Sequence, residues 1–315
     1  MNFADQIVRS IEKRNSYICA GIDPRVDKIP SSYKDSAAKS AKTSEELVYA
    51  LLTKFYFDGL ETLSSDVCCV KPNTAFFEQY GIGGMKALHS ICSKANELEL
   101  PIVLDAKRGD IGSTAEAYAD ASLGGTKFMG EPIETLISDA VTVNPFLGFD
   151  TLEPFLDRCV KDGKGVFVLV KTSNPGSKAL QDLRDPSGKS ASELVAAWVA
   201  EHGEKCLGDS GLSNLGAVVG ATYPEEAVEM RKLMPNAIFL IPGMGSQGGS
   251  AADAIKSFSF KDGRPTGDGL INLSRGIFSS FSSLDLGEQE TRDELKSKVD
   301  SVNEQIQSAI KAASA

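Results

Sequence analysis

Short apolar runs alternate with amphipathic stretches along the whole chain. Eight of these runs, rich in Val, Ile, Leu and Ala, have the length and composition of buried strands. Turn residues or segments with a charged helical face separate each run from the next. We expect strands at residues 17–23, 67–73, 101–107, 140–144, 166–173, 215–222, 238–243 and 269–274.

Segments with apolar residues three and four positions apart fill most of the intervals and predict helices. The clearest of them lie at residues 44–63, 85–98, 152–160, 191–206 and 225–233, with two more at the ends of the chain, 3–14 and 290–313. Strands that alternate with helices indicate parallel βα units. Eight such units favour a closed barrel over an open, doubly wound sheet. We therefore expect an α/β protein, a (β/α)8 TIM barrel with an extra N-terminal helix and a C-terminal helix.

We expect residues 1–315 to form a single domain, because no low-complexity linker divides the sequence. Two stretches rich in Pro, Gly and Ser, 174–189 and 261–269, have the composition of loops.

The charge of the chain limits its partners. Lysine and arginine total 33 against 43 acidic residues, a net charge of -10, which disfavours binding to nucleic acid or to an anionic membrane. The six cysteines form no Cys-x-x-Cys pair, and only His89 and His202 are available for a zinc site or a Ser-His-Asp triad. The first residues lack the pattern of a signal peptide, and no apolar window has the length of a membrane span. We expect a soluble, cytoplasmic protein with reduced thiols.

Charged residues end several of the predicted strands. In a TIM barrel the active site lies at the C-terminal ends of the strands. Lys71 follows the second apolar run, and the third ends in the segment 105–110, Asp-Ala-Lys-Arg-Gly-Asp. Asp105 and Lys107 are two residues apart and should face the same side of their strand. Alternating charges of this kind hold several ions in a dry site at low cost and are typical of catalytic electrostatics.

Glycine-rich segments follow the seventh and eighth predicted strands. They read Pro-Gly-Met-Gly-Ser-Gln-Gly-Gly at 242–249 and Asn-Leu-Ser-Arg-Gly-Ile at 272–277. Glycines let the backbone approach an anion, N–H groups at a helix start point toward it, and Arg275 adds a charged fork. Because barrels often bind phosphate after these two strands, we expect a phosphate site here.

The segment 105–114, Asp-Ala-Lys-Arg-Gly-Asp-Ile-Gly-Ser-Thr, resembles the signature of orotidine 5'-monophosphate decarboxylases. Lys-Pro-Asn at 71–73 and the two glycine-rich segments extend this likeness over nearly the whole chain. This variant of the motifs resembles the group of these enzymes found in many bacteria and in apicomplexan parasites. The resemblance implies a TIM barrel that converts orotidine 5'-monophosphate to UMP and CO2, the last step of de novo UMP biosynthesis, with no metal and no organic cofactor.

The resemblance also implies a role for individual residues. Lys71, Asp105, Lys107 and Asp110 would form the catalytic network, with Lys107 protonating C6 of the pyrimidine. Asp110 and Thr114 would reach into the active site of the partner subunit, so that a homodimer shares its two sites. The other implied substrate contacts are Asp23 and Asn73 near the ribose, Ser173 at the pyrimidine edge, Gln247, Arg275 and the amide of Gly276 at the phosphate, and Ile111 and Pro242 elsewhere in the pocket. A strand register shifted by one residue would exchange Ser173 for Thr172.

Three alternatives remain open from the sequence. The first is a Mg-dependent sugar-phosphate decarboxylase or aldolase, such as keto-gulonate phosphate decarboxylase or hexulose phosphate synthase. The second is a Schiff-base aldolase that uses Lys171, which lies on a predicted strand on the same face as Ser173. The third is an inactive phosphate-binding barrel that serves in assembly. Since no phosphoribosyltransferase domain is found, orotate phosphoribosyltransferase is a candidate partner that would supply the substrate.

Overall fold

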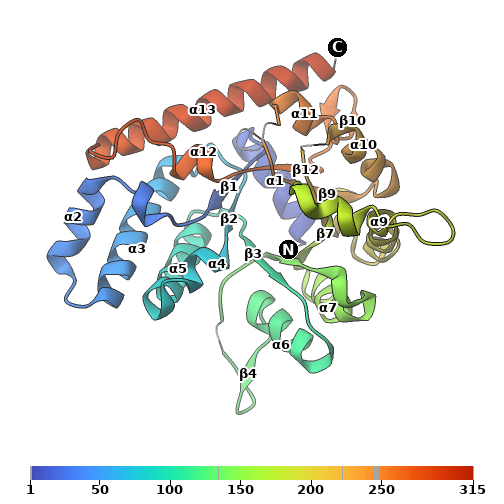
Figure 1. Cartoon of the computed structure of the whole chain (residues 1–315), viewed down its shortest axis with the longest axis horizontal. Coiled ribbons are helices and arrows are strands. Elements are labelled where there is room, and N and C mark those ends of the chain that lie inside the picture. The colour runs from blue at the N-terminus through green and yellow to red at the C-terminus, as the bar shows by residue number, and fades with distance from the viewer. Residues whose placement is uncertain (1, 134, 222, 245–248, 315) are drawn as a thin grey trace.

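The protein is a parallel barrel wrapped by helices, as its computed structural model shows for residues 2–133, 135–221, 223–244 and 249–314 (Figure 1). Within these ranges eight strands form one sheet in the order β2-β1-β12-β9-β8-β7-β6-β3. The bridges Val70 to Ile102 and Asn73 to Asp105 join β2 to β3 and close the sheet. The strands are β1 (Ile18–Ile22), β2 (Cys69–Pro72), β3 (Val103–Arg108), β6 (Ala140–Val143), β7 (Gly165–Lys171), β8 (Ser213–Val219), β9 (Ala237–Ile241) and β12 (Gly269–Leu273).

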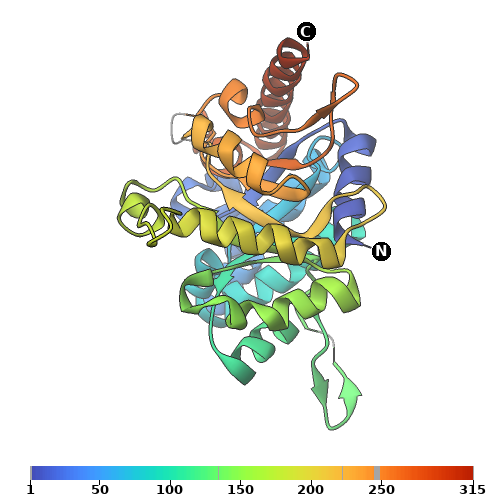
Figure 2. The ribbon, with the colours of Figure 1, turned by 90° about the vertical axis from the view of Figure 1, so that its right-hand side faces the viewer.

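Helices connect successive strands and cover the outside of the barrel (Figures 1 and 2). The α-helices are α1 (Phe3–Arg14), α2 (Ser31–Ser40), α3 (Ser44–Leu63), α4 (Thr74–Glu78), α5 (Gly81–Glu97), α6 (Gly112–Leu123), α7 (Glu153–Asp162), α8 (Lys178–Gln181), α9 (Ala191–Gly203), α10 (Pro224–Leu233), α11 (Ala251–Ile255), α12 (Arg275–Phe278) and α13 (Glu288–Ala313). Short 3-10 helices are η1 (Val26–Lys28), η2 (Pro145–Leu147), η3 (Phe149–Leu152), η4 (Pro175–Ser177) and η5 (Glu204–Cys206).

The predicted TIM barrel is confirmed, and the expected strands agree with the observed ones to within a few residues. Residue 222, at the end of one expected strand, lies outside the described residues. The expected loop 174–189 is wrong in part, because it contains η4 and α8, and 261–269 contains the hairpin β10 (Phe260–Lys261) and β11 (Arg264–Pro265). None of the helices in the described ranges is long and apolar enough to cross a bilayer.

Helix α1 covers the end of the barrel opposite the charged strand ends. Asn2 caps it by accepting hydrogen bonds from the N–H groups of Ala4 and Asp5. The Phe3 ring packs edge-on against Phe167 of β7, with ring centroids 5.8 Å apart. Because this end of the barrel is filled with apolar side chains, the open end must be the one that carries the polar residues.

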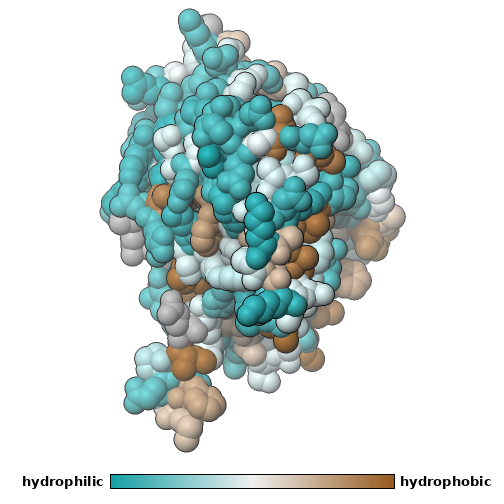
Figure 3. Space-filling view, turned by 90° about the vertical axis from the view of Figure 1, so that its left-hand side faces the viewer, coloured by the Kyte–Doolittle hydropathy of each residue, from teal (hydrophilic) through white to brown (hydrophobic). Residues whose placement is uncertain are grey.

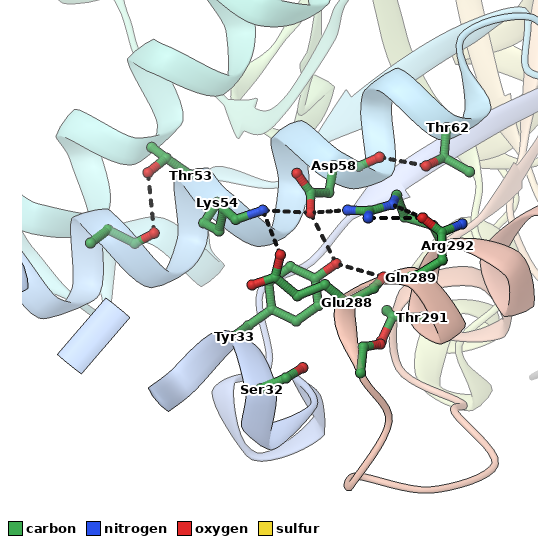
Figure 4. A network of polar contacts seen from close by, with 12 residues as sticks. Ser32, Tyr33, Thr53, Lys54, Asp58, Thr62, Glu288, Gln289, Thr291 and Arg292 are labelled. Carbon is green, nitrogen blue, oxygen red and sulfur yellow. Dashed lines mark hydrogen bonds and ion pairs between the residues drawn. The ribbon is translucent and has the colours of Figure 1, made fainter. Parts of the chain in front are cut away.

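The C-terminal helix α13 lies across α3 and is held there by a group of ionic contacts (Figure 4). The carboxylate of Asp58 accepts hydrogen bonds from Lys54 at 2.8 Å, Arg292 at 2.7 Å and the Tyr33 hydroxyl at 3.2 Å. Lys54 also pairs with Glu288 at 2.9 Å. The network ties α2 and α3 to α13, which in turn contacts α12, the helix that begins with Arg275.

One hairpin projects from the body of the molecule. Strands β4 (Lys127–Phe128) and β5 (Glu131–Pro132) follow α6 and extend away from the barrel (Figures 1 and 2). Phe128 and Met129 are 64% and 90% exposed. The face of the molecule seen in Figure 3 is mainly hydrophilic, with scattered apolar side chains on the body.

Candidate active site

A cavity of about 1000 Å³ opens at the C-terminal ends of the barrel strands. It is large enough for a nucleotide and lies where TIM barrels place their active sites. Nine of the residues singled out from the sequence line it: Asp23, Lys71, Asn73, Asp105, Lys107, Ser173, Pro242, Arg275 and Gly276. Gln247 lies outside the described residues.

Asp105 lies between two lysines on the wall of this cavity. One carboxylate oxygen, Oδ2, accepts a hydrogen bond from Lys71 Nζ at 2.6 Å, and Oδ1 accepts one from Lys107 Nζ, also at 2.6 Å. The side chains of Lys71 and Asp105 are only 6% and 7% exposed, whereas that of Lys107 is 49% exposed. Of the two ammonium groups, that of Lys107 is therefore the more accessible to a molecule in the cavity.

Neighbouring opposite charges favour the ionised forms of Asp105 and Lys71. Burial alone would raise the pKa of Asp105, but the two ammonium groups beside it hold that pKa well below its ordinary value. Burial would likewise lower the pKa of Lys71, yet the charge of Asp105, followed by that of Asp23, raises it. Around neutral pH the site therefore contains a buried carboxylate with positive charge on two sides.

Lys107 has a strained backbone. Its φ angle is 47°, in the left-handed region that non-glycine residues seldom adopt. Such a conformation costs about 1 to 3 kcal/mol and persists only where the surrounding structure enforces it. The side chains of Asp105 and Lys107 do meet, as expected. The alternation of a regular strand does not explain this, because the backbone of Lys107 is not extended.

The residues that follow β3, Asp110, Ile111 and Thr114, are not part of the cavity lining. Asp110 Oδ1 accepts a hydrogen bond from the N–H of Ile111 at 2.8 Å. Ile111 is 63% exposed, and Thr114 is also exposed on the first turn of α6. The structure of the single chain does not bring Asp110 into contact with the Lys71, Asp105 and Lys107 network, and it leaves Ile111 and Thr114 outside the cavity lining.

Two oxygen atoms in the cavity wall accept no hydrogen bond from the described part of the chain. They are Asp23 Oδ1, just after β1, and Asn272 Oδ1 on β12, and both are buried. Asn73 Oδ1 accepts a hydrogen bond from the N–H of Ala75 and caps α4. Buried acceptors of this kind are suited to hydroxyl or amide donors of a ligand. Asn272 belongs to the glycine-rich segment 272–277, but its residue type alone does not indicate a contact with a ligand.

Arg275 and Gly276 lie at the end of the cavity formed by β12 and β9. Both are exposed at the start of α12, and Pro242, Gly243 and Met244 line the same end. A side-chain carbon at Gly276 would meet open space, so the backbone there is accessible to a ligand. An arginine beside an accessible backbone at this position is the arrangement expected for a phosphate group.

The hydrogen bonds after β7 indicate which of Thr172 and Ser173 is available to a ligand. The N–H of Thr172 donates to Gln181 Oε1 at 3.0 Å, and its hydroxyl accepts from Gln181 Nε2 at 2.8 Å and donates to Asn174 Oδ1 at 2.7 Å. Thr172 is therefore engaged by the segment that follows it. Both residues line the cavity, and this engagement favours Ser173 as the one that contacts a ligand.

Lys171 is placed differently from what an aldolase requires. Its side chain pairs with Asp182 and, at 3.0 Å, with Glu226 on α10, and it is absent from the residues that line the cavity. Burial would lower the pKa of Lys171, but its hydrogen bonds to Asp182 and Glu226 raise it. A Schiff-base lysine needs the opposite shift, so this geometry counts against that alternative.

All six cysteines are buried free thiols, as expected. Among the described residues no group of three or more His, Cys, Asp or Glu side chains is arranged to hold a metal ion.

Known proteins resemble this chain over most of its length. The profile of the orotidine 5'-phosphate decarboxylase / HUMPS family matches residues 35–283. Orotidine 5'-phosphate decarboxylase from Rhodopirellula baltica is 42% identical over 310 residues, which cover 97% of this chain and 99% of that protein. A crystal structure from Toxoplasma gondii, assigned to orotidine-monophosphate decarboxylase, superimposes with a TM-score of 0.77 at 32% identity and covers 99% of this chain and 97% of the other.

A longer protein contains a similar unit. UMP synthase from Leishmania donovani superimposes with a TM-score of 0.70 at 32% identity, covering 96% of this chain but 57% of that protein. The family profile, the identity of these relatives and the shared barrel agree with one another. This chain belongs to the orotidine 5'-phosphate decarboxylase / HUMPS family.

Proposed function

We propose that this protein decarboxylates orotidine 5'-monophosphate to UMP and CO2. The observation that carries the proposal is the buried Asp105 carboxylate held between the ammonium groups of Lys71 and Lys107 at the mouth of the cavity. Relatives named orotidine 5'-phosphate decarboxylase at up to 42% identity support the same substrate. Because one fold can support several chemistries, the reaction is inferred from the residues of the site.

The reaction needs positive charge next to C6 of the pyrimidine ring. When the bond from C6 to the carboxylate carbon breaks, its electron pair remains on C6 in the plane of the ring, and CO2 leaves. No carbonyl group conjugates with that pair, so the protein must stabilise it electrostatically. Lys107 is the exposed ammonium of the network; it donates a proton to C6 and regains one from solvent.

Asp105 destabilises the bound substrate relative to the product. In the proposed complex its carboxylate lies near the carboxylate of the substrate, and two like charges about 4 Å apart cost roughly 4 kcal/mol at an effective dielectric near 20. Loss of CO2 removes this repulsion. Lys71, buried behind Asp105, keeps the carboxylate charged and in place.

The rest of the nucleotide fits the other cavity residues. We assign the ribose hydroxyls to Asp23 and Asn73, and the pyrimidine edge to Ser173. The phosphate is assigned to Arg275 and the amide of Gly276. Binding energy collected at the phosphate, far from C6, is then available to orient the ring for reaction. Pro242 and Ile111 are proposed as further contacts, and Gln247, though outside the described residues, as a third phosphate contact.

We also propose a homodimer with shared active sites. Asp110, Ile111 and Thr114 lie between the end of β3 and the first turn of α6, outside the lining of their own cavity. Asp110 is half-buried there, and Ile111 and Thr114 are exposed. A partner subunit placed against this surface would receive Asp110 and Thr114 in its own site and complete its charge network. A symmetric dimer exchanges the same residues in both directions.

Two further assignments concern the partner and the cellular location of the protein. Orotate phosphoribosyltransferase is proposed as a partner, supported by the UMP synthase whose chain extends well beyond the unit that resembles this one. We propose the cytoplasm as the location, because six free thiols suit a reducing compartment.

The test is release of CO2 from orotidine 5'-monophosphate by purified protein, with and without EDTA. We expect release that EDTA does not change and that Lys107→Ala reduces by at least about a thousandfold, since the proton donor is lost. Release that stops with EDTA and returns with Mg would instead favour a sugar-phosphate enzyme. No release by folded wild-type protein would overturn the proposal.

A further inference from the structure

The ladder between β3 and β6 is interrupted beside the charge network. Val103 and Leu104 pair with Ala140 and Val141, and the pairing resumes only at Arg108 with Val143. Residues 105–107 of β3 therefore lie opposite a single residue of β6, Thr142. Such a bulge breaks the regular hydrogen-bond ladder and redirects side chains.

The hydroxyl of Thr142 fills this interruption. Its Oγ1 accepts a hydrogen bond from the N–H of Lys107 at 2.9 Å and donates one to Asp105 Oδ1, also at 2.9 Å. Thr142 is 1% exposed, so little water reaches these two bonds. One hydroxyl thus contacts the backbone of the proposed proton donor and the carboxylate that faces the substrate.

We propose that Thr142 is a positioning residue that holds Lys107 and Asp105 in their reactive geometry. The proposal rests on the decarboxylase function assigned to this site. Lys107 adopts its left-handed backbone angle, φ 47°, where Thr142 supplies an acceptor for its N–H in place of the missing ladder bond. The same bond network fixes the rotation of the Asp105 carboxylate, because Lys107 Nζ and Thr142 Oγ1 both donate to Oδ1.

Two substitutions of Thr142 separate the effect of its hydroxyl group from the effect of its side-chain volume. Thr142→Val keeps the shape but removes the donor and acceptor, which leaves the Lys107 N–H and one site on Asp105 unsatisfied. Thr142→Ser keeps the hydroxyl and loses a methyl group. As a matched control, Thr291→Val removes the hydroxyl of another fully buried threonine, which donates to the Gly287 carbonyl at 2.8 Å on α13.

The experiment measures kcat and KM for orotidine 5'-monophosphate, together with the melting temperature. We expect Thr142→Val to lower kcat about 100-fold, because misplacing a reacting group by about 1 Å has that effect, while KM changes less than about threefold. Thr142→Ser should stay within about fivefold of wild type. Thr291→Val should keep the wild-type kcat even if its melting temperature falls.

Three results would overturn the proposal: wild-type kcat in Thr142→Val, equal losses in Thr142→Val and Thr142→Ser, or an equal loss of kcat in Thr291→Val. Activity of the wild-type protein in the same assay tests the decarboxylase function separately. If wild type releases no CO2, a crystal structure of Thr142→Val still decides the positioning role. We expect Lys107 to leave the left-handed region in it, and an unchanged Lys107 backbone would refute the role.

Discussion

Arg275 is the residue whose role is easiest to isolate, because its proposed ligand, the phosphate, is remote from the bond that breaks. Replacing it by alanine removes a charge-assisted hydrogen bond of about 2 to 3 kcal/mol. We expect Arg275→Ala to lower kcat/KM on orotidine 5'-monophosphate by roughly 30- to 150-fold. On the nucleoside orotidine, which has no phosphate, the same variant should change kcat/KM by less than about threefold.

The controls for Arg275 concern charge and geometry. Arg275→Lys keeps the positive charge without the planar fork, so its loss should be intermediate. Arg264→Ala removes an exposed arginine of β11 that is not in the cavity lining and should have no effect. Equal losses on nucleotide and nucleoside would contradict a role for Arg275 at the phosphate.

For individual residues, the sequence predicted which side chains lie together at the cavity. It did not predict the hydrogen bonds and backbone geometry that position them. Lys71, Asp105 and Lys107 could be placed together because charges at the ends of parallel strands meet at one end of a barrel. The bulge opposite Thr142 could not be predicted, since it depends on the register between β3 and β6, two strands far apart in sequence. For the same reason Thr142, inside the apolar run 140–144, gave no sign of a role.

At the scale of the elements, residues 174–189, which follow β7, are attached to the barrel in part through Lys171, a lysine that lies outside the cavity lining. Lys171 pairs with Asp182 in this segment and with Glu226 on α10, whose side chains are 40% and 36% exposed. We expect Lys171→Met to weaken the attachment of residues 174–189 by about 1 to 2 kcal/mol, discounted for that exposure. Leu180 and Leu183, 57% and 60% exposed, should then be cut roughly 5- to 30-fold faster by a protease specific for leucine.

A surface lysine provides the comparison for this measurement. Lys161 pairs with Asp157 on α7 in an exposed i,i+4 pair, and Lys161→Met should leave the cleavage rate unchanged. If Lys171→Met is cut no faster than Lys161→Met, the three-residue ion pair does not hold the segment. Saturation with UMP should slow cleavage in both variants, provided that the segment packs over the bound nucleotide.

The long elements followed from the sequence, whereas the short ones did not. Helices α1 and α3 have the expected bounds, because each combines a clear apolar period with an N-cap, Asn2 for α1 and Thr43 for α3. Helix α8 is only four residues long and lies in a stretch rich in Pro, Gly and Ser. Gln181 contacts Thr172, just after β7, and Asp182 pairs with Lys171 at the end of β7. Such tertiary contacts cannot be predicted from the local sequence.

For the whole molecule, the mechanism depends on whether one subunit contains a complete site. The single chain brings together Lys71, Asp105 and Lys107. It leaves the half-buried Asp110 and the exposed Thr114 outside the cavity lining. Barrel closure and the cavity could be anticipated from the count of βα units, since both depend on one chain. The sequence pattern of one chain does not indicate an interface between two chains. The shared active site was therefore predicted only from the resemblance to the family.

Mixed dimers decide the point. We expect Lys107→Ala and Asp110→Ala to be inactive alone, yet a heterodimer purified with two affinity tags should recover about half of the wild-type activity. In that heterodimer both lesions fall in one of the two sites if Asp110 crosses the interface, which leaves the other site intact. A heterodimer of Lys71→Ala with Lys107→Ala is the control and should stay inactive, because these lysines act in their own subunit and each site then carries one lesion. Failure of the first pair to recover activity would place Asp110 in its own subunit's site, and the proposal of a shared site would have to be abandoned.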